Sequence, residues 1–168
     1  MQNPKQRLNW CLKQPKGIRL VTPSENLAKA YHKKAENALK SMEINAQAGL
    51  TDWAVSASYY AKYFAAYSSL SKIGVKSEIH DCTITLFEHI FCDSISSELL
   101  KDLRNSKKDR VEMQYYTQEI QVDLKQIIKK TKKFVLEIEK IIDDLTTEKI
   151  TELQNKLKNL QQNRPQPQ

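Results

Sequence analysis

The chain has 168 residues and a mass of 19.5 kDa, which is the usual size of one domain with a single core. It contains only 3 glycines and 5 prolines, too few for the frequent turns of an all-β protein, so long helices are expected. The net charge of +7 favours acidic partners such as RNA, nucleotides or an acidic protein face, although solvated lysine-rich helices produce the same excess.

Residues 1–23 form a polar, basic leader. Leu8, Trp10, Ile18 and Leu20 are its apolar residues, and we expect them to hold it across the bundle as an irregular segment or short helix. The N-terminus lacks the apolar core of a signal peptide, and charges interrupt every window that approaches the roughly 18 apolar residues of a membrane span. A cytoplasmic protein without membrane contact is therefore expected.

The chain has three cysteines, an odd number without the spacing of a disulfide framework, which favours a reducing compartment. Cys82, His89 and Cys92 would approach one side of a helix but lack a fourth ligand, so we predict no metal site. His32 and His80 have no catalytic neighbour in the sequence and are predicted to lie at the surface.

No proline interrupts residues 24–146, which we predict to be the helical bundle. Ser24 is a suitable N-cap for a first helix that ends at Gly49, because glycine accepts the left-handed conformation of helix C-caps. A second helix is expected from Thr51 to Gly74, with a seam of small residues that allows close packing. The seam consists of Ala54, Ala57, Ala61 and Ala65.

A third, short helix is expected after Ser77, and a fourth over residues 94–105. The polar run SKKD at 106–109 is the predicted bend, followed by one long fifth helix over 111–145. Such a helix has more apolar surface than a small bundle can cover, which favours pairing between subunits. The fold class predicted is all-α, an up-and-down bundle of four or five helices.

Residues 147–162 are predicted to form a C-terminal helical extension, and residues 163–168 a frayed tail. The extension carries Ile150, Leu153, Leu157 and Leu160 at heptad-like spacing. This apolar seam is too short for a secure coiled-coil prediction, and it could dock on its own bundle or on a partner.

Several segments together resemble the HEPN family of small helical bundles. The resemblance rests on AVSASYYAKYFAAYSSLSKIGVKSEIHDCTITL at 54–86, on RVEMQYYT at 110–117 and on the leader RLNWCLKQPKGIRL, and it covers about residues 5–145. Members of that family are four- or five-helix bundles, commonly homodimers, that divide into ribonuclease toxins and non-catalytic binding modules. Many are encoded beside a minimal nucleotidyltransferase, which the resemblance therefore implies as a possible partner.

The family's toxins share an arginine followed by four to six residues and then a histidine, a pairing suited to phosphate binding and proton transfer. This chain has five arginines, and none is followed by histidine at that spacing. After Arg104 the permitted positions hold Asp109, Arg110 and Val111. We therefore predict no catalytic residues, no cofactor and a non-catalytic binding module.

The predicted ligand site lies near the expected bend, where arginine and lysine would bind phosphates and tyrosines would stack on a base. It comprises Arg104, Asn105, Lys107, Lys108, Asp109, Arg110, Tyr115 and Tyr116. In the alternative interpretation without a ligand, the lysines are solvated and one tyrosine belongs to the core. Two alternatives remain: a divergent metal-independent ribonuclease using Arg104, Asp109 and a tyrosine, or a scaffold whose leucine seam recruits another protein.

Two further groups have simpler explanations. On the second helix, Tyr60, Phe64 and Tyr67 share one face and are predicted to be core, whereas Tyr59 and Tyr63 could edge a pocket. The lysines of KKTKK at 129–133 are followed by acidic residues within three turns, which is typical of a solvated helix face.

Overall fold

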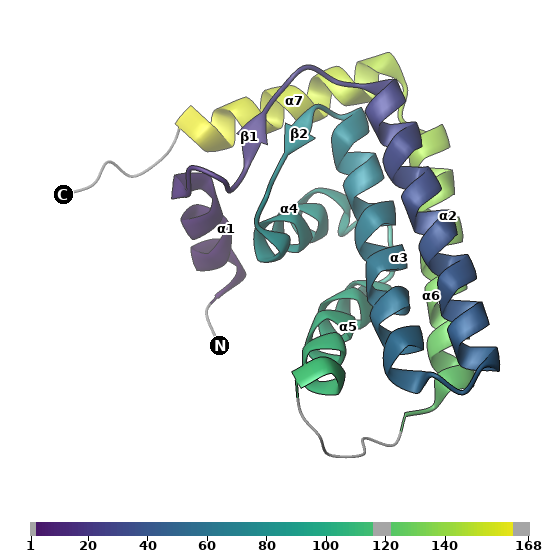
Figure 1. Cartoon of the computed structure of the whole chain (residues 1–168). Coiled ribbons are helices and arrows are strands. Elements are labelled where there is room, and N and C mark those ends of the chain that lie inside the picture. Colours follow the sequence, from purple (N-terminus) through teal and green to yellow (C-terminus); the bar gives the residue numbers. More distant parts are fainter. Residues whose placement is uncertain (1–2, 116–121, 163–168) are drawn as a thin grey trace.

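The computed structural model describes residues 3–115 and 122–162, and it confirms the all-α helical bundle (Figure 1). Two-residue strands are the other regular elements in these ranges. In chain order the elements are α1 (Pro4–Lys13), β1 (Arg19–Leu20), α2 (Glu25–Gln47), α3 (Thr51–Lys72), β2 (Val75–Lys76), α4 (His80–Phe91), α5 (Ser97–Tyr115), α6 (Leu124–Asp143) and α7 (Thr147–Gln162).

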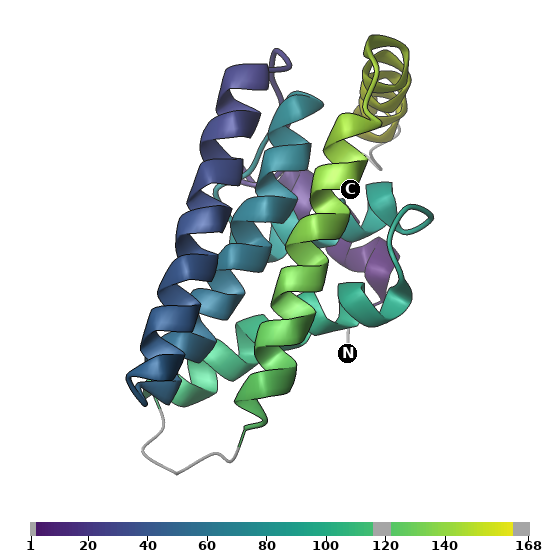
Figure 2. The same cartoon turned by 90° about the vertical axis from the view of Figure 1, so that its right-hand side faces the viewer.

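Helix α3 lies at the centre of the fold, with α2 and α6 on its two sides (Figure 2). The four alanines of the predicted small-residue seam are all buried, which lets the neighbouring helices approach closely. Helix α5 crosses the first half of α3 and packs against it. This arrangement places the side chains of α3 and α5 against one another, which matters for the site described below.

The start of α2 and the C-terminal ends of α2 and α3 follow from local chemistry, as predicted, whereas α3 begins after Leu50 without a side-chain cap. The hydroxyl of Ser24 accepts a hydrogen bond from the backbone N–H of Leu27 at 3.1 Å and caps α2. Gly49 follows α2 with φ of 73°, and Gly74 follows α3 with φ of 76°. A Cβ at Gly74 would also lie 2.4 Å from the carbonyl oxygen of Val21, so only glycine fits there.

The leader contains a short helix, one of the two forms predicted, and also a strand that was not predicted. It forms α1 and then β1, which pairs antiparallel with β2, Leu20 opposite Val75. Cys11 and Cys82 form a disulfide that joins α1 to α4. The expectation of no disulfide was therefore wrong for two of the three cysteines, and cysteine usage no longer favours a reducing compartment.

Two predictions about the second half of the chain were wrong. The expected bend at 106–109 lies inside α5, which continues to Tyr115, because its buried residues keep a helical spacing through the polar run, where Ser106 takes the buried position. The expected single helix over 111–145 is divided, since α6 begins only at Leu124, capped by the side chain of Asp123. The interval 116–121 lies outside the described residues.

Helix α7 lies across the end of the bundle near β1 (Figure 1). Leu157 is buried, and Ile150, Leu153 and Leu160 pack against the core. The leucine seam therefore docks on its own bundle, which removes the support for the scaffold alternative. Nowhere in residues 3–115 and 122–162 is a helix both long and apolar enough to cross a membrane.

Candidate nucleic-acid interface

The predicted site residues lie along a continuous helix and point in several directions around it. Asn105 and Lys108 are exposed, and Tyr115 is 73% exposed at the end of α5. Asp109 is half-buried, and burial raises the pKa of its carboxyl group. Tyr116 lies outside the described residues. The structure therefore divides the predicted cluster between different surroundings.

Arg104 is held by neighbouring side chains. Its Nε donates to Oε1 of Glu88 at 2.9 Å, and its Nη2 contacts the other oxygen of that carboxylate. The same nitrogen donates to the hydroxyl of Thr85 at 3.3 Å. This paired geometry ties α5 to α4, so the guanidinium is already neutralised.

Lys107 is also paired, because its ammonium lies 2.6 Å from a carboxylate oxygen of Asp81 at the start of α4. Lys108 contacts Glu112 on its own helix at 3.4 Å, and its side chain is 74% exposed. The positive charges of both lysines therefore face acidic partners, one across the α4–α5 contact and one on the surface.

Arg110 has a different environment. Its guanidinium carbon lies 5.6 Å from the ring centroid of Tyr59 and 5.3 Å from that of Tyr60, which is cation–π geometry. Its Nε is buried and has no hydrogen-bond partner in the described part of the chain. Unlike Arg104, this arginine is positioned by aromatic rings, and no ion pair within the described residues neutralises its charge.

His80, the first residue of α4, joins the same cluster and is half-buried, so its prediction as a surface residue was wrong. Its ring stacks on Tyr63 with centroids 4.1 Å apart, and its Nδ1 shares a hydrogen bond of 2.6 Å with the hydroxyl of Tyr59. Burial first, and then the charges of Arg110 and Lys107, lower the pKa of His80. The imidazole is therefore neutral near pH 7.

The aromatic residues of α3 are buried only partly as predicted: Tyr67 belongs to the core, but Tyr60 and Phe64 do not. Tyr59 and Tyr63 are buried, whereas Tyr60 and Phe64 are only partly covered. Burial raises the pKa of Tyr63 to about 12, so its hydroxyl stays protonated at neutral pH. Two aromatic rings of α3, those of Tyr59 and Tyr63, are therefore buried, whereas the rings of Tyr60 and Phe64 are partly accessible to a ligand.

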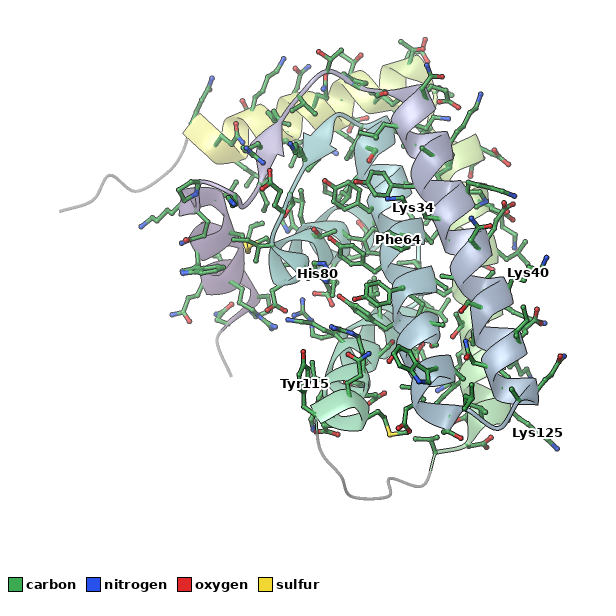
Figure 3. The ribbon with its side chains drawn as sticks, in the orientation of Figure 1. Lys34, Lys40, Phe64, His80, Tyr115 and Lys125 are labelled. Atoms are coloured by element: carbon green, nitrogen blue, oxygen red, sulfur yellow. A yellow bond between two sulfur atoms is a disulfide. The ribbon has the colours of Figure 1, made fainter. Side chains whose placement is uncertain are left out.

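The aromatic surface continues from α3 onto α2. Tyr60 and Phe64 stack with centroids 5.8 Å apart, and the ammonium of Lys34 lies 5.4 Å from the ring centroid of Phe64. Lys34, Phe64 and His80 lie along one face in Figure 3. A hollow of about 500 Å³ beside Lys34, Tyr60 and Phe64 is lined by residues of α2 and α3 and by Gln114 of α5.

We call this surface the aromatic–cationic face. It comprises Lys34, Tyr60, Phe64, His80 and Arg110, with the buried ring of Tyr59 beneath Arg110. Rings beside cations can stack on bases while the cations contact phosphates, which is how single-stranded nucleic acids are held without sequence reading.

A buried ion pair supports the α3–α5 contact beneath this face. The ammonium of Lys62, only 1% exposed, lies 2.6 Å from Oδ2 of Asp102 and donates to Ser106 at 2.8 Å. Desolvation lowers the pKa of Lys62 in spite of the attraction of Asp102. The pair fixes the register between α3 and α5, and thereby the position of Arg110 over the tyrosines.

Sequence reasoning found Arg110 and suspected Tyr59, but it missed His80 and Lys62. The signal for Lys62 was available, because it is the one charged residue in the run from Ala54 to Leu70 of a helix otherwise built from alanine, serine and aromatic residues. His80 could not be placed, because its partners come from a helix 20 residues earlier and another 30 residues later.

A family model described as HEPN domain matches residues 28–145, more than two thirds of the chain. The matched range runs from α2 to just beyond α6 and so contains the whole aromatic–cationic face. No curated protein matches the chain.

Proposed function

The chain belongs to the HEPN domain family, and from that premise we propose that it is a non-catalytic module that binds single-stranded RNA or a nucleotide on the aromatic–cationic face. The observation that carries the proposal is the contrast between two arginines of α5. Arg104 is neutralised by Glu88, whereas Arg110 lies on two tyrosine rings with its Nε unpartnered among the described residues. A phosphate would neutralise the charge of Arg110 while its base stacks on the partly exposed ring of Tyr60.

The net charge of +7 supports an anionic ligand, and the neighbouring hollow supplies space for a base. Arg110 contributes the charge, Tyr60 and Phe64 contribute partly accessible ring faces, and Lys34 adds a second cation at the far end. The smallest ligand that would contact all these groups is one phosphate with one or two unpaired bases.

Replacing Arg110 with glutamine should weaken the binding of a short single-stranded RNA by about 1.5–3 kcal/mol, because a charge-assisted bond in a shielded site is lost. Fluorescence anisotropy at fixed salt measures the loss. Lys108→Gln is the matched control, since it also removes one positive charge, two residues before Arg110 and at an exposed position. It should change the affinity less than about threefold.

Equal losses in the two variants would indicate diffuse electrostatics and contradict a site at Arg110. If the parent chain binds neither RNA nor nucleotide, the nucleic-acid proposal is wrong. A protein partner would then be the remaining explanation for this face, and a minimal nucleotidyltransferase is the one to test.

One observation favours a second candidate, a metal-independent ribonuclease. The imidazole missing after the arginines in sequence is supplied in space by His80, close enough to Arg110 for that charge to lower its pKa. A neutral imidazole can accept a proton while the guanidinium stabilises a phosphate. RNA from the binding assay decides between the two: it should stay intact, and cleavage that is lost in His80→Gln would establish the ribonuclease.

We also propose that the protein forms a homodimer through the end of the α2–α3 hairpin. The predicted long helix is divided and no longer supports a dimer, but Leu50, Trp53 and Tyr115 are 50%, 62% and 73% exposed at this end. Such apolar side chains are typical of an interface. Light scattering at micromolar concentration should give twice the 19.5 kDa chain mass, and Trp53→Ser should shift it toward the monomer. A monomeric parent would contradict the proposal.

A further inference from the structure

A second hollow lies on a different part of the molecule, between α2 and α6. Its volume is about 370 Å³, and residues of both helices line it. None of the residues of the aromatic–cationic face belongs to it. Three side chains at this hollow can each offer a metal ligand: His32, Glu36 and Glu139.

The fold brings these three groups together from distant parts of the chain. His32 and Glu36 are one helical turn apart on α2, so they share a face, and Glu139 reaches them from α6, 107 residues after His32. Nε2 of His32 lies 2.9 Å from Oε1 of Glu139 and 3.9 Å from Oε1 of Glu36. All three ligand atoms lie within 4.8 Å of one another.

These separations suit a small divalent transition-metal ion. A tetrahedral zinc ion with nitrogen and oxygen ligands at about 2.0–2.2 Å places neighbouring ligand atoms about 3.3 Å apart, and the two measured distances lie on either side of this value. One imidazole and two carboxylates are ligand types that zinc accepts, with water in the fourth position. The hollow leaves room for that water.

The surrounding charges are compatible with such an ion. Lys33 contacts Oε2 of Glu36 at 2.8 Å, while Oε1 of the same carboxylate faces His32. An outer hydrogen bond of this kind orients a metal-binding carboxylate. The side chain of Lys33 is 70% exposed, so it can also move away without cost to the core.

We propose that His32, Glu36 and Glu139 form a zinc-type cation site that clamps α2 to α6. An ion bound there joins two helices that flank α3 and binds only the folded chain, so it stabilises the fold. The site is independent of RNA binding, because it shares no residue with the aromatic–cationic face.

The test is a Zn²⁺ titration of the full chain after treatment with a chelator, followed by calorimetry and by thermal unfolding. We expect one Zn²⁺ per chain and a raised unfolding temperature. His32→Gln and Glu139→Gln should each weaken binding at least about tenfold and remove the thermal shift. Circular dichroism confirms that both variants fold, and Glu139→Gln preserves side-chain size where the histidine change does not.

His89→Gln and Cys92→Ser are the matched controls, because His89 in α4 and Cys92 directly after it are exposed and offer zinc ligands elsewhere. They should bind like the parent chain. Co²⁺ should give visible d–d bands without a thiolate charge-transfer band. The proposal is overturned by an absence of binding at 100-fold excess of metal over protein, by unchanged binding in both ligand variants, or by loss of binding in Cys92→Ser.

Discussion

Replacing Asp102 with alanine is expected to lower the free energy of unfolding by about 3–5 kcal/mol at neutral pH. The change leaves the ammonium of Lys62, 1% exposed in α3, without the carboxylate 2.6 Å away that neutralises it. An unpaired buried charge costs more than the pair contributes, because desolvation is no longer offset. Urea unfolding followed by circular dichroism measures the loss.

The double variant Lys62→Met with Asp102→Ala is the control, because it removes both charges and keeps the volume of the lysine stem. It should recover more than half of the loss. A double variant as unstable as Asp102→Ala alone would show that packing, not charge, caused the effect. An Asp102→Ala loss below about 1 kcal/mol would mean that the pair is solvated.

The deficit of Asp102→Ala should also depend on pH. Desolvation holds the folded pKa of Lys62 below its ordinary value of 10.5, and removing Asp102 lowers it further. Between the folded and unfolded pKa values the unfolded chain binds more protons, so this contribution to stability rises with pH. The difference between parent and variant should therefore shrink as the pH rises from about 7 toward 10.

Removing the disulfide between Cys11 and Cys82 is expected to destabilise the fold by about 4 kcal/mol. The bond joins residues 71 apart in sequence, and a crosslink over a loop of that length restricts the unfolded chain strongly. The double variant Cys11→Ala with Cys82→Ala removes it, and urea unfolding measures the loss. Cys92→Ser should leave the stability unchanged, because this thiol is free and exposed.

Alkylation of the unfolded, unreduced parent chain should label one thiol, and all three after reduction. Labelling of three thiols before reduction would show that the bond does not form. A reductant should lower the unfolding temperature of the parent and leave that of the double alanine variant unchanged. Equal responses would contradict the assigned role of the disulfide.

The sequence sufficed for elements whose signals are local. The Ser24 cap, the turns at Gly49 and Gly74 and the alanine seam all depend on residues within one or two turns of chain. The bend predicted at 106–109 was wrong because a polar run resembles a loop in composition, although Ser106 and Lys107 find polar partners on α3 and α4 within a continuous helix. The strand and the disulfide of the leader could not be predicted, because both depend on residues far along the chain.

Only part of the candidate site could be predicted from the sequence. Arg104 and Arg110 look equivalent in sequence, but Arg104 pairs with Glu88, whereas Arg110 lies over two tyrosine rings. Nothing local distinguishes them, because both distinctions come from other helices. The same holds for His80, whose burial and neighbours arise only when α4 packs beside α3 and α5.

Histidine-selective NMR during titration with a short single-stranded RNA tests the site most directly, because the chain has only three histidines. His80 lies in the aromatic–cationic face, whereas His32 lies between α2 and α6 and His89 is exposed on α4. We expect the ring signals of His80 to shift with bound RNA, those of His32 and His89 to stay unchanged, and Arg110→Gln to remove the shift. Bound RNA that leaves the His80 signals unchanged would contradict it.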